Sequence, residues 1–330
     1  MGLVRKISFS LIAMKISFQR TNIYFVVAVS LMFSVSAYPQ TKKPLAAPLR
    51  SINVAAQPGA TVWIDNVRYG NTDKAGLLKI KMVTDGAHTL RVRADGFKEK
   101  SQPITAVQKG EIRISLVKTT DAAELAYQEA ERLTSVDRDK AADAYKKAIK
   151  LRPNYPEAFL GLARVLSDSG DLDEAERAII SARKLRPAYP EASAVLGRIY
   201  KDGGEEKRAV AAFKRAITEG KGFQPEAYAG LGLIYKEKAE GYGGSGDFEN
   251  ETANYVESAK YLKTAVKQLA SAPDAAVIYQ LLGLIYERQK KYADAIATYE
   301  NFLRIFPDSA EATAVRSFIV QLKKVQPPQD

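Results

Sequence analysis

A repeat of 34 residues constrains this chain more than any other feature of its sequence. Small residues recur at that interval, as Ala141, Ala175 and Ala209 show. The tetrapeptide Tyr-Pro-Glu-Ala that begins at Tyr155 begins again at Tyr189. A fixed period of this length is typical of stacked helix pairs, because one pair cannot bury its apolar face alone. Such a stack presents a long concave surface, so the repeat predicts a binding protein more readily than an enzyme.

The repeat organises the chain from about residue 122 to its C-terminal part. A last helix, from about Ser309 to Val325, caps the stack in this interpretation, and residues 326–330 form a frayed tail. Small residues in both helices of a unit let the two axes approach to about 8–10 Å. The predicted units are residues 122–155, 156–189, 190–224, 225–275 and 276–309. The small residues are Ala163, Gly197, Gly232 and Gly283 in first helices, and Ala141, Ala175, Ala209, Ser258 and Ala295 in second helices.

Bulky side chains and prolines complete the pattern. Pro153, Pro187 and Pro307 follow second helices, which a proline cannot continue. The bulky residues of the second helices are Tyr145, Ile179, Phe213, Leu262 and Tyr299. With these features, residues 120–325 resemble tetratricopeptide repeats. The resemblance implies an all-α superhelix in which side chains of the first helices line the concave face.

On that basis we predict a groove of mixed charge that binds a protein or an extended peptide. The clamp that some members use for C-terminal carboxylates is not recognisable, because Leu160, Ala194 and Ala229 stand where polar side chains are needed. The predicted partner-binding residues are Arg164, Asp168, Arg198, Lys201, Asp202, Lys236, Glu237, Gln280, Glu287 and Arg288.

The fourth unit departs from the rule, because it spans 51 residues. Most of the excess is a glycine-rich, acidic run at residues 239–251, which we expect to be a flexible loop between the two helices. The loop is either a tolerated insertion or a segment that contacts a partner.

Residues 51–118 have a different pattern, in which apolar and polar residues alternate between short turn sequences. This pattern predicts an antiparallel β-sandwich. Arg91, Arg93 and Arg113 are expected to face outward. The residues expected to face inward are Leu90, Val92, Ile112, Ile114 and Leu116. The single histidine, His88, follows the Asp-Gly turn at 85–86, so we interpret it as a residue at the end of a strand.

At four places this segment resembles the PEGA domain, a small β-module of bacterial envelope and surface proteins. The matching stretches are residues 59–65, 70–72, 85–92 and 96–97, although Gln57-Pro58-Gly59-Ala60 stands where the family has Pro-Glu-Gly-Ala. The resemblance implies a spacer, an anchor or a module that contacts a polymer. Trp63, the only tryptophan, is either a core residue of this domain or a platform on which a sugar stacks.

The first 37 residues have the features of an export signal. An apolar run from Ile23 to Val35 follows Lys15 and Arg20 and precedes Val35-Ser36-Ala37, a cleavage pattern of small residues before Tyr38. Met14 would give this signal a cleaner start. Residues 38–50 then form a linker. The alternative is an uncleaved signal that anchors the protein in the inner membrane.

Composition excludes several classes of function. The chain has no cysteine and one histidine, so thiolate catalysis and cysteine- or histidine-rich metal sites are ruled out, and we expect no cofactor. No pair of carboxylates suggests a general acid and base, and we expect no catalytic residue. The net charge is +11, yet residues 119–330 are nearly neutral, whereas residues 50–118 carry 12 basic and 6 acidic residues. Nucleic acid is not expected as a partner of an exported protein.

Together these features predict a multidomain chain, an all-β sandwich followed by an all-α superhelix. We interpret it as an exported, non-catalytic scaffold or adaptor of the bacterial cell envelope, located in the periplasm, outer envelope or outside the cell. Its groove would bind a protein or peptide. The alternative function is binding of an envelope glycan or another anionic polymer through the basic β-domain.

Overall fold

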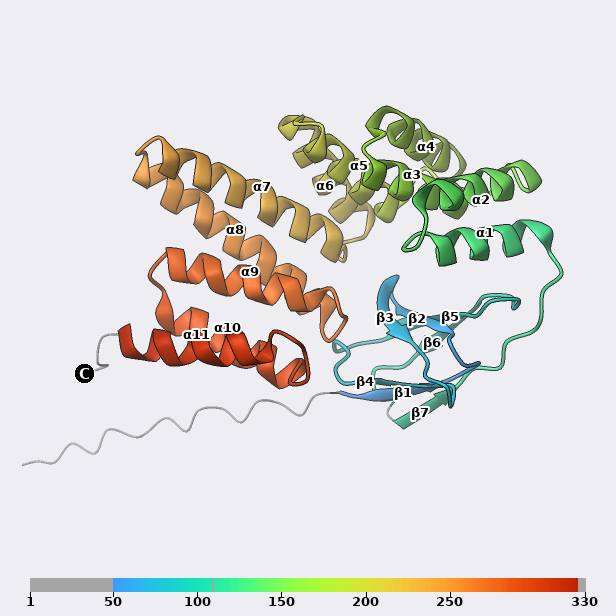
Figure 1. The fold of residues 1–330 in the computed structure, drawn as a ribbon, viewed down its shortest axis with the longest axis horizontal. Coiled ribbons are helices and arrows are strands. Elements are labelled where there is room, and N and C mark those ends of the chain that lie inside the picture. Colours follow the sequence, from blue (N-terminus) through green and yellow to red (C-terminus); the bar gives the residue numbers. More distant parts are fainter. Residues whose placement is uncertain (1–49, 109, 326–330) are drawn as a thin grey trace, which may run out of the picture. The chain divides into compact units, whose positions relative to one another are not determined.

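The computed structural model describes residues 50–108 and 110–325, which form a β-domain followed by a helical array (Figure 1). The predicted signal at residues 1–37, nearly all of the linker and the tail at residues 326–330 lie outside the described residues. Within the described part of the chain, no helix is both long and apolar enough to cross a membrane.

The β-domain is a sandwich of two sheets. One sheet has the strand order β4-β1-β7 and the other has the order β3-β2-β5-β6. The strands are β1 (Ile52–Ala55), β2 (Thr61–Ile64), β3 (Val67–Asn71), β4 (Leu77–Ile80), β5 (His88–Arg93), β6 (Lys100–Ile104) and β7 (Gly110–Arg113). The prediction of a purely antiparallel sandwich is wrong in one place, because β1 pairs with β7 in parallel. A crossing connection between sheets separates these two strands, and alternation of residues carries no signal of strand direction.

The core of the sandwich lies between the two sheets. Val54, Val62, Leu90 and Val92 have no exposed surface, and Ile112 is also buried. These residues alternate with outward-facing ones, as the period-two pattern predicts. The inward positions of Leu90, Val92, Ile112, Ile114 and Leu116 are confirmed. His88 begins β5, as expected.

A two-residue turn made of Asp65 and Asn66 joins β2 to β3. Both residues have a positive φ, 48° and 66°, as the type I′ hairpin turn requires. The Asp65 carboxylate is fixed by two partners of β5, the His88 ring Nδ1 at 2.6 Å and the Thr89 backbone N–H at 2.8 Å. The turn therefore holds one defined conformation, in which the Asn66 side chain is free to reach away from the sandwich.

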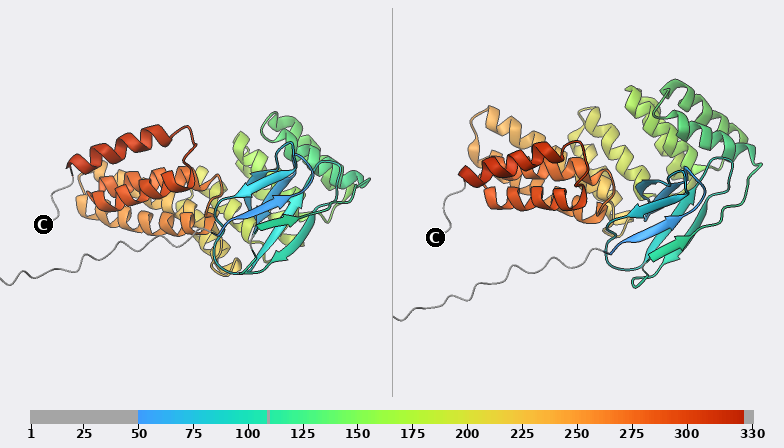
Figure 2. Two further views of the ribbon diagram at one scale, coloured as in Figure 1. Left: turned by 90° about the horizontal axis from the view of Figure 1, so that it is seen from below. Right: turned by 60° about the horizontal axis from the view of Figure 1, so that its bottom comes forward.

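Eleven described helices make up the array, and consecutive helices run antiparallel (Figures 1 and 2). Pro156, Pro190 and Pro225 each occupy the first position of a helix, where the missing N–H has no cost. The helices are α1 (Ala122–Leu133), α2 (Arg138–Leu151), α3 (Pro156–Ser169), α4 (Leu172–Leu185), α5 (Pro190–Asp202), α6 (Glu206–Glu219), α7 (Pro225–Gly244), α8 (Phe248–Leu269), α9 (Ala275–Arg288), α10 (Tyr292–Ile305) and α11 (Ala312–Val325).

Close packing of small residues against bulky ones holds each helix pair together. The Phe213 ring of α6 lies between Gly197 of α5 and Gly230 of α7. A Cβ on either glycine would come within 2.5 or 2.2 Å of ring atoms. In the long pair, the Ser258 hydroxyl donates a hydrogen bond of 2.6 Å to the Gly232 carbonyl across the α7–α8 contact. The paired small residues predicted from the sequence therefore serve as the contact points of the helices.

The expectation of a flexible loop at residues 239–251 is wrong. Helix α7 continues through Gly244 and α8 begins at Phe248, so the additional residues lengthen both helices of the pair (Figure 1). The connection is a short turn, and the Asp247 side chain caps α8 by accepting a hydrogen bond from the backbone N–H of Asn250 at 3.1 Å. Backbone hydrogen bonds and the packing of α7 on α8 outweigh the low helix propensity of glycine, which costs about 1 kcal/mol per residue.

Glycines in α5 and α7 give a paired test of this packing. Gly197→Ala should destabilise the protein by about 1–3 kcal/mol, because the trapped Phe213 ring cannot move away without striking Gly230. Gly241→Ala, at an open helical position with no atom within 4 Å of the new Cβ, should stabilise it by about 0.5–1 kcal/mol. Urea unfolding of the two variants measures both. Equal effects would show that the close approach does not control stability.

Candidate functional site

The concave face of the array contains a cleft of about 800 Å³. Helices α3, α5, α7 and α9 supply one side of its lining, and strands β2, β3 and β5 with the β2–β3 turn supply the other. Of the predicted groove residues, Arg164, Arg198, Lys201 and Asp202 lie on this lining. The other six, namely Asp168, Lys236, Glu237, Gln280, Glu287 and Arg288, are not among the described residues that line it.

Ion pairs within the array hold most of the predicted groove charges. The Arg164 guanidinium reaches Glu226 of α7 at 2.8 Å, and Arg198 lies 3.2 Å from Asp168 of α3. The Lys201 ammonium lies between its neighbour Asp202, at 3.6 Å, and Glu237 of α7, at 3.1 Å. These side chains connect one repeat to another, so a partner would meet charges that are already neutralised.

The remaining predicted residues are placed differently. Lys236 pairs with Glu240 of the same helix at 2.7 Å. The Glu287 carboxylate accepts a hydrogen bond of 2.6 Å from the Tyr299 hydroxyl of α10. Burial and this carboxylate raise the pKa of Tyr299 well above its ordinary value. Gln280 is half-buried and Arg288 is exposed on α9. Whether any of these residues binds a partner stays a prediction.

The part of the cleft lining that is not engaged in ion pairs is an aliphatic floor. Leu160, Ala229 and Leu233 are half-buried there, and Val277 is 62% exposed. The sequence singled out Leu160 and Ala229 only because they exclude a polar clamp. Their equivalent positions in the first helices of two units were the signal for an apolar floor, and the sequence-based prediction of a charged groove missed it.

The opposite wall of the cleft belongs to the β-domain. Trp63 lies on the face of β2 opposite to Val62 and Ile64, which are in the core. It is only 9% exposed, because the guanidinium of Arg91 covers its ring at 4.1 Å from the centroid. Arg91 in turn pairs with Glu99 at 3.0 Å. Trp63 is therefore buried, as a core residue is, but it lies outside the cluster between the two sheets, and it is no open platform for a sugar.

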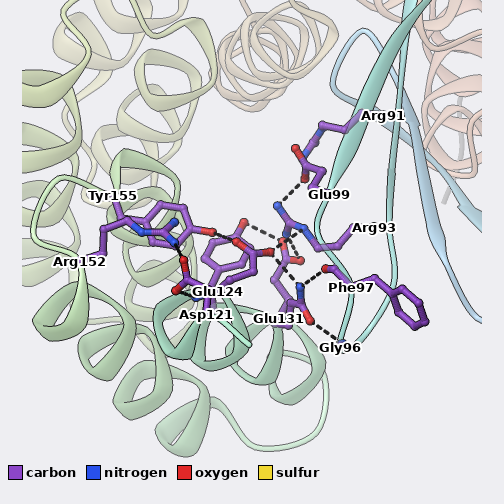
Figure 3. Close-up of polar contacts among 12 residues, drawn as sticks. Arg91, Arg93, Gly96, Phe97, Glu99, Asp121, Glu124, Glu131, Arg152 and Tyr155 are labelled. Atoms are coloured by element: carbon purple, nitrogen blue, oxygen red, sulfur yellow. Dashed lines mark hydrogen bonds and ion pairs between the residues drawn. The ribbon is translucent and has the colours of Figure 1, made fainter. Parts of the chain in front are cut away.

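Arg93 joins the β-domain to the first helix of the array (Figure 3). The expectation that its side chain faces water is wrong, since only 6% of it is exposed. It pairs with Glu99 of its own domain at 2.5 Å and with Glu131 of α1, and it lies over the Tyr127 ring at 4.4 Å. Burial would lower the pKa of Arg93, but Tyr127, Glu131 and Glu99 raise it well above its ordinary value. The outward face of β5 meets α1 where the pattern predicts solvent.

Gln128 of α1 adds a second connection beside Arg93. Its side-chain oxygen accepts a hydrogen bond from the Gly96 N–H and its amide donates to the Phe97 carbonyl, both at 2.8 Å (Figure 3). The side chain is thereby satisfied by a loop of the β-domain, although it is buried. Nothing in the sequence marks Gln128, because its partners are backbone groups of a distant segment.

Family-level sequence matches agree with this architecture. The description "PEGA domain" matches residues 51–120, and "Tetratricopeptide repeat" matches residues 133–199, 190–219 and 276–309. The chain is a tetratricopeptide-repeat (TPR) protein with an N-terminal PEGA domain. A TPR array is a protein-interaction scaffold.

Several solved structures are similar to the helical array. Yeast Tom70 has a TM-score of 0.50 at 17% identity, over 62% of this chain and 40% of that one. TTC0263, a thermophilic TPR protein of Thermus thermophilus, has 19% identity over 62% of this chain and 100% of that one, with a TM-score of 0.45. The MamA protein has 23% identity over 58% of this chain and 96% of that one, with a TM-score of 0.39. No curated protein matches the sequence.

The described residues offer no group of three or more His, Asp or Glu side chains that could hold a metal ion. Several of their carboxylates instead form ion pairs and hydrogen bonds between helices. One such cluster lies in the TPR array, where Glu219 of α6 accepts hydrogen bonds from Arg183 of α4 at 2.8 Å, Ser193 of α5 at 2.7 Å and Arg215 of its own helix at 2.8 Å. Burial alone would raise the pKa of Glu219, but the three donors lower it to about 2.

The Glu219 cluster predicts how the array responds to acid. Because the pKa is lower in the folded than in the unfolded state, Glu219 stabilises the fold above the ordinary pKa of 4.5, and this contribution is lost as the pH falls toward about 2. Glu219→Gln should therefore be destabilised at neutral pH, and the gap from wild type should narrow across that window. Urea unfolding at a series of pH values measures the gap. Glu257→Gln, in an exposed pair with Lys260, serves as the control. A gap that is constant with pH would contradict the assignment.

Proposed function

We propose that this protein is an exported, non-catalytic scaffold of the bacterial cell envelope whose TPR groove binds an extended segment of a protein partner. The observation that carries the proposal is the cleft of about 800 Å³ on the concave face, with its aliphatic floor and its rim of paired charges. A volume in this range suits a short segment, because ligand sites commonly measure about 300–1,000 Å³.

The chemistry of the lining indicates the kind of segment. Burial of Leu233 and Val277 by an aliphatic side chain removes apolar area from water, which contributes about 25 cal/mol per Å². The surrounding charges are committed to Glu226, Asp168 and Glu237, so an acidic or basic segment would have to break existing pairs. We therefore propose a partner segment with aliphatic side chains at its centre and neutral polar residues beside them.

The alternative function, binding of an envelope glycan or anionic polymer by the PEGA domain, has less support. Arg91 and Arg93 are both paired with Glu99, which removes two of the cations on which that alternative depends. Exposed lysines such as Lys74 and Lys79, in and just before strand β4 of the other sheet, remain available. Salt-sensitive pelleting of the full chain with cell-wall material, lost on reversal of these two lysines to Glu, would favour this alternative.

A single substitution in the cleft tests the binding function. Val277→Asp places a carboxylate in the first turn of α9, where the helix dipole stabilises a negative charge, so the helix should still form. The same carboxylate puts a charge into the aliphatic floor of the cleft. Peptides selected on the wild-type chain from a random displayed library should be rich in aliphatic residues. They should bind Val277→Asp at least about tenfold more weakly, a change of about 1.4 kcal/mol. Fluorescence anisotropy measures both affinities.

Phe248→Asp is the matched control, since Phe248 is an exposed apolar residue in the first turn of α8 and lies outside the cleft lining. It should bind the selected peptides as wild type does. Equal affinity of wild type and Val277→Asp would show that the peptides bind elsewhere and would overturn the groove proposal.

Export rests on the apolar run between Ile23 and Val35 and the small residues before Tyr38. N-terminal sequencing of the protein recovered from an expressing bacterial cell should give a mature chain that begins at Tyr38, in the fraction outside the inner membrane. Recovery of the chain in the membrane fraction with residues 23–35 retained would show instead that the segment is an uncleaved membrane anchor.

A further inference from the structure

The β2–β3 turn of the PEGA domain lies at the groove that the proposed function assigns to a partner. Residues 65–68 line the same cleft as Arg164, Arg198 and Lys201. The Asn66 side chain donates a hydrogen bond of 2.7 Å to the Glu191 carboxylate in the first turn of α5. A segment distant in the sequence thus contacts the concave face in the way a ligand would.

Further contacts hold the PEGA domain against helices that are far apart in the array. At one end, α1 is joined through Gln128 and through the Arg93–Glu131 pair. At the other, Ser271 in the α8–α9 turn donates to the Met82 carbonyl at 2.8 Å and accepts from the Met82 N–H at 2.9 Å. Helix pairs in such an array contact mainly their neighbours, so a bridge between distant turns fixes the curvature of the groove.

The part of this bridge at the β2–β3 turn and at Ser271 is reversible. The hydrogen bonds of Asn66 and Ser271 involve groups that water can also satisfy, whereas Arg93 and Gln128 at the α1 end are buried and hold that end in place. The bond from Asn66 is exposed, whereas the residues that hold each domain together are fully buried. The short connection at residues 114–121 keeps the turn at a high effective concentration beside the groove.

We propose that the PEGA domain is the resident occupant of the TPR groove, and that a protein partner that enters the groove displaces the β2–β3 turn. This inference rests on the proposed function and adds its regulation: affinity for a partner depends on how tightly the chain's own turn is held. Loosening the turn should raise the affinity, because the binding-competent state becomes more populated.

The absence of native cysteines provides a direct test on the full chain. Ala229→Cys places one thiol in the cleft lining, and its rate of reaction with a bulky maleimide reports whether the groove is covered. Asn66→Gly with Ser271→Ala removes two ties, while glycine keeps the positive φ that the turn requires. We expect this release variant to react at least tenfold faster than the Ala229→Cys parent.

Lys290→Gly is the matched control, because Lys290 also has a positive φ, 57°, but lies outside the cleft lining. It should react at the parental rate. Gln128→Ala offers an independent route to release at α1 if the first variant folds poorly, as judged by circular dichroism. Parental rates in both release variants would overturn the inference.

A second arm uses a defined probe, a cyclised peptide of residues 60–71 that contains the β2–β3 turn. Added to the release variant, it should restore protection of the thiol introduced at position 229, whereas a cyclised peptide of scrambled sequence should not. Protection by neither peptide would show that the groove does not recognise the turn. The library-selected peptides are a separate measurement, so failure of this inference leaves the groove proposal standing, and failure of the Val277 test leaves the thiol rates interpretable.

Discussion

The close approach of paired helices is the constraint on which the rest of this structure depends. Where Phe213 fits between Gly197 and Gly230, three successive helices are held at a distance that a single additional methyl group would change. The same arrangement recurs where Gly161 faces Tyr145 and where Gly283 faces Tyr299. Because such contacts recur along the array, the small offset between units accumulates into a concave face, and the cleft on that face follows from the packing.

A second level of organisation is polar and connects parts that the repeat alone would leave independent. Arg93 is buried between two domains with carboxylates from both, and Gln128 satisfies a loop of the PEGA domain with its side-chain amide. Breaking a buried pair of this kind leaves an uncompensated charge, which is costly, so the contact specifies one arrangement of the interface. The groove therefore has one wall made of repeats and one made of a different fold.

The sequence predicted the fold class closely and the site only in part. The repeat period located the helix pairs, and strand alternation located the inward residues of the sandwich. Two of the expectations that failed show the physical reason most clearly. The run at residues 239–251 was expected to be a loop because glycine disfavours helix, yet pairing of α7 with α8 overrides that local preference. Arg93 was expected in water because charged residues usually are, yet α1 supplies the carboxylate that permits its burial.

The sequence by itself determined the features that depend on neighbours along the chain: the units, the small residues at helix contacts and the prolines that follow second helices. Only the tertiary structure decided which charges remain free. Arg164 forms a salt bridge with Glu226 two repeats away, and Asn66 donates a hydrogen bond to Glu191 across a domain boundary. Such pairs join residues more than 60 positions apart. They depend on the curvature of the whole array, and no local pattern of residue types encodes that curvature.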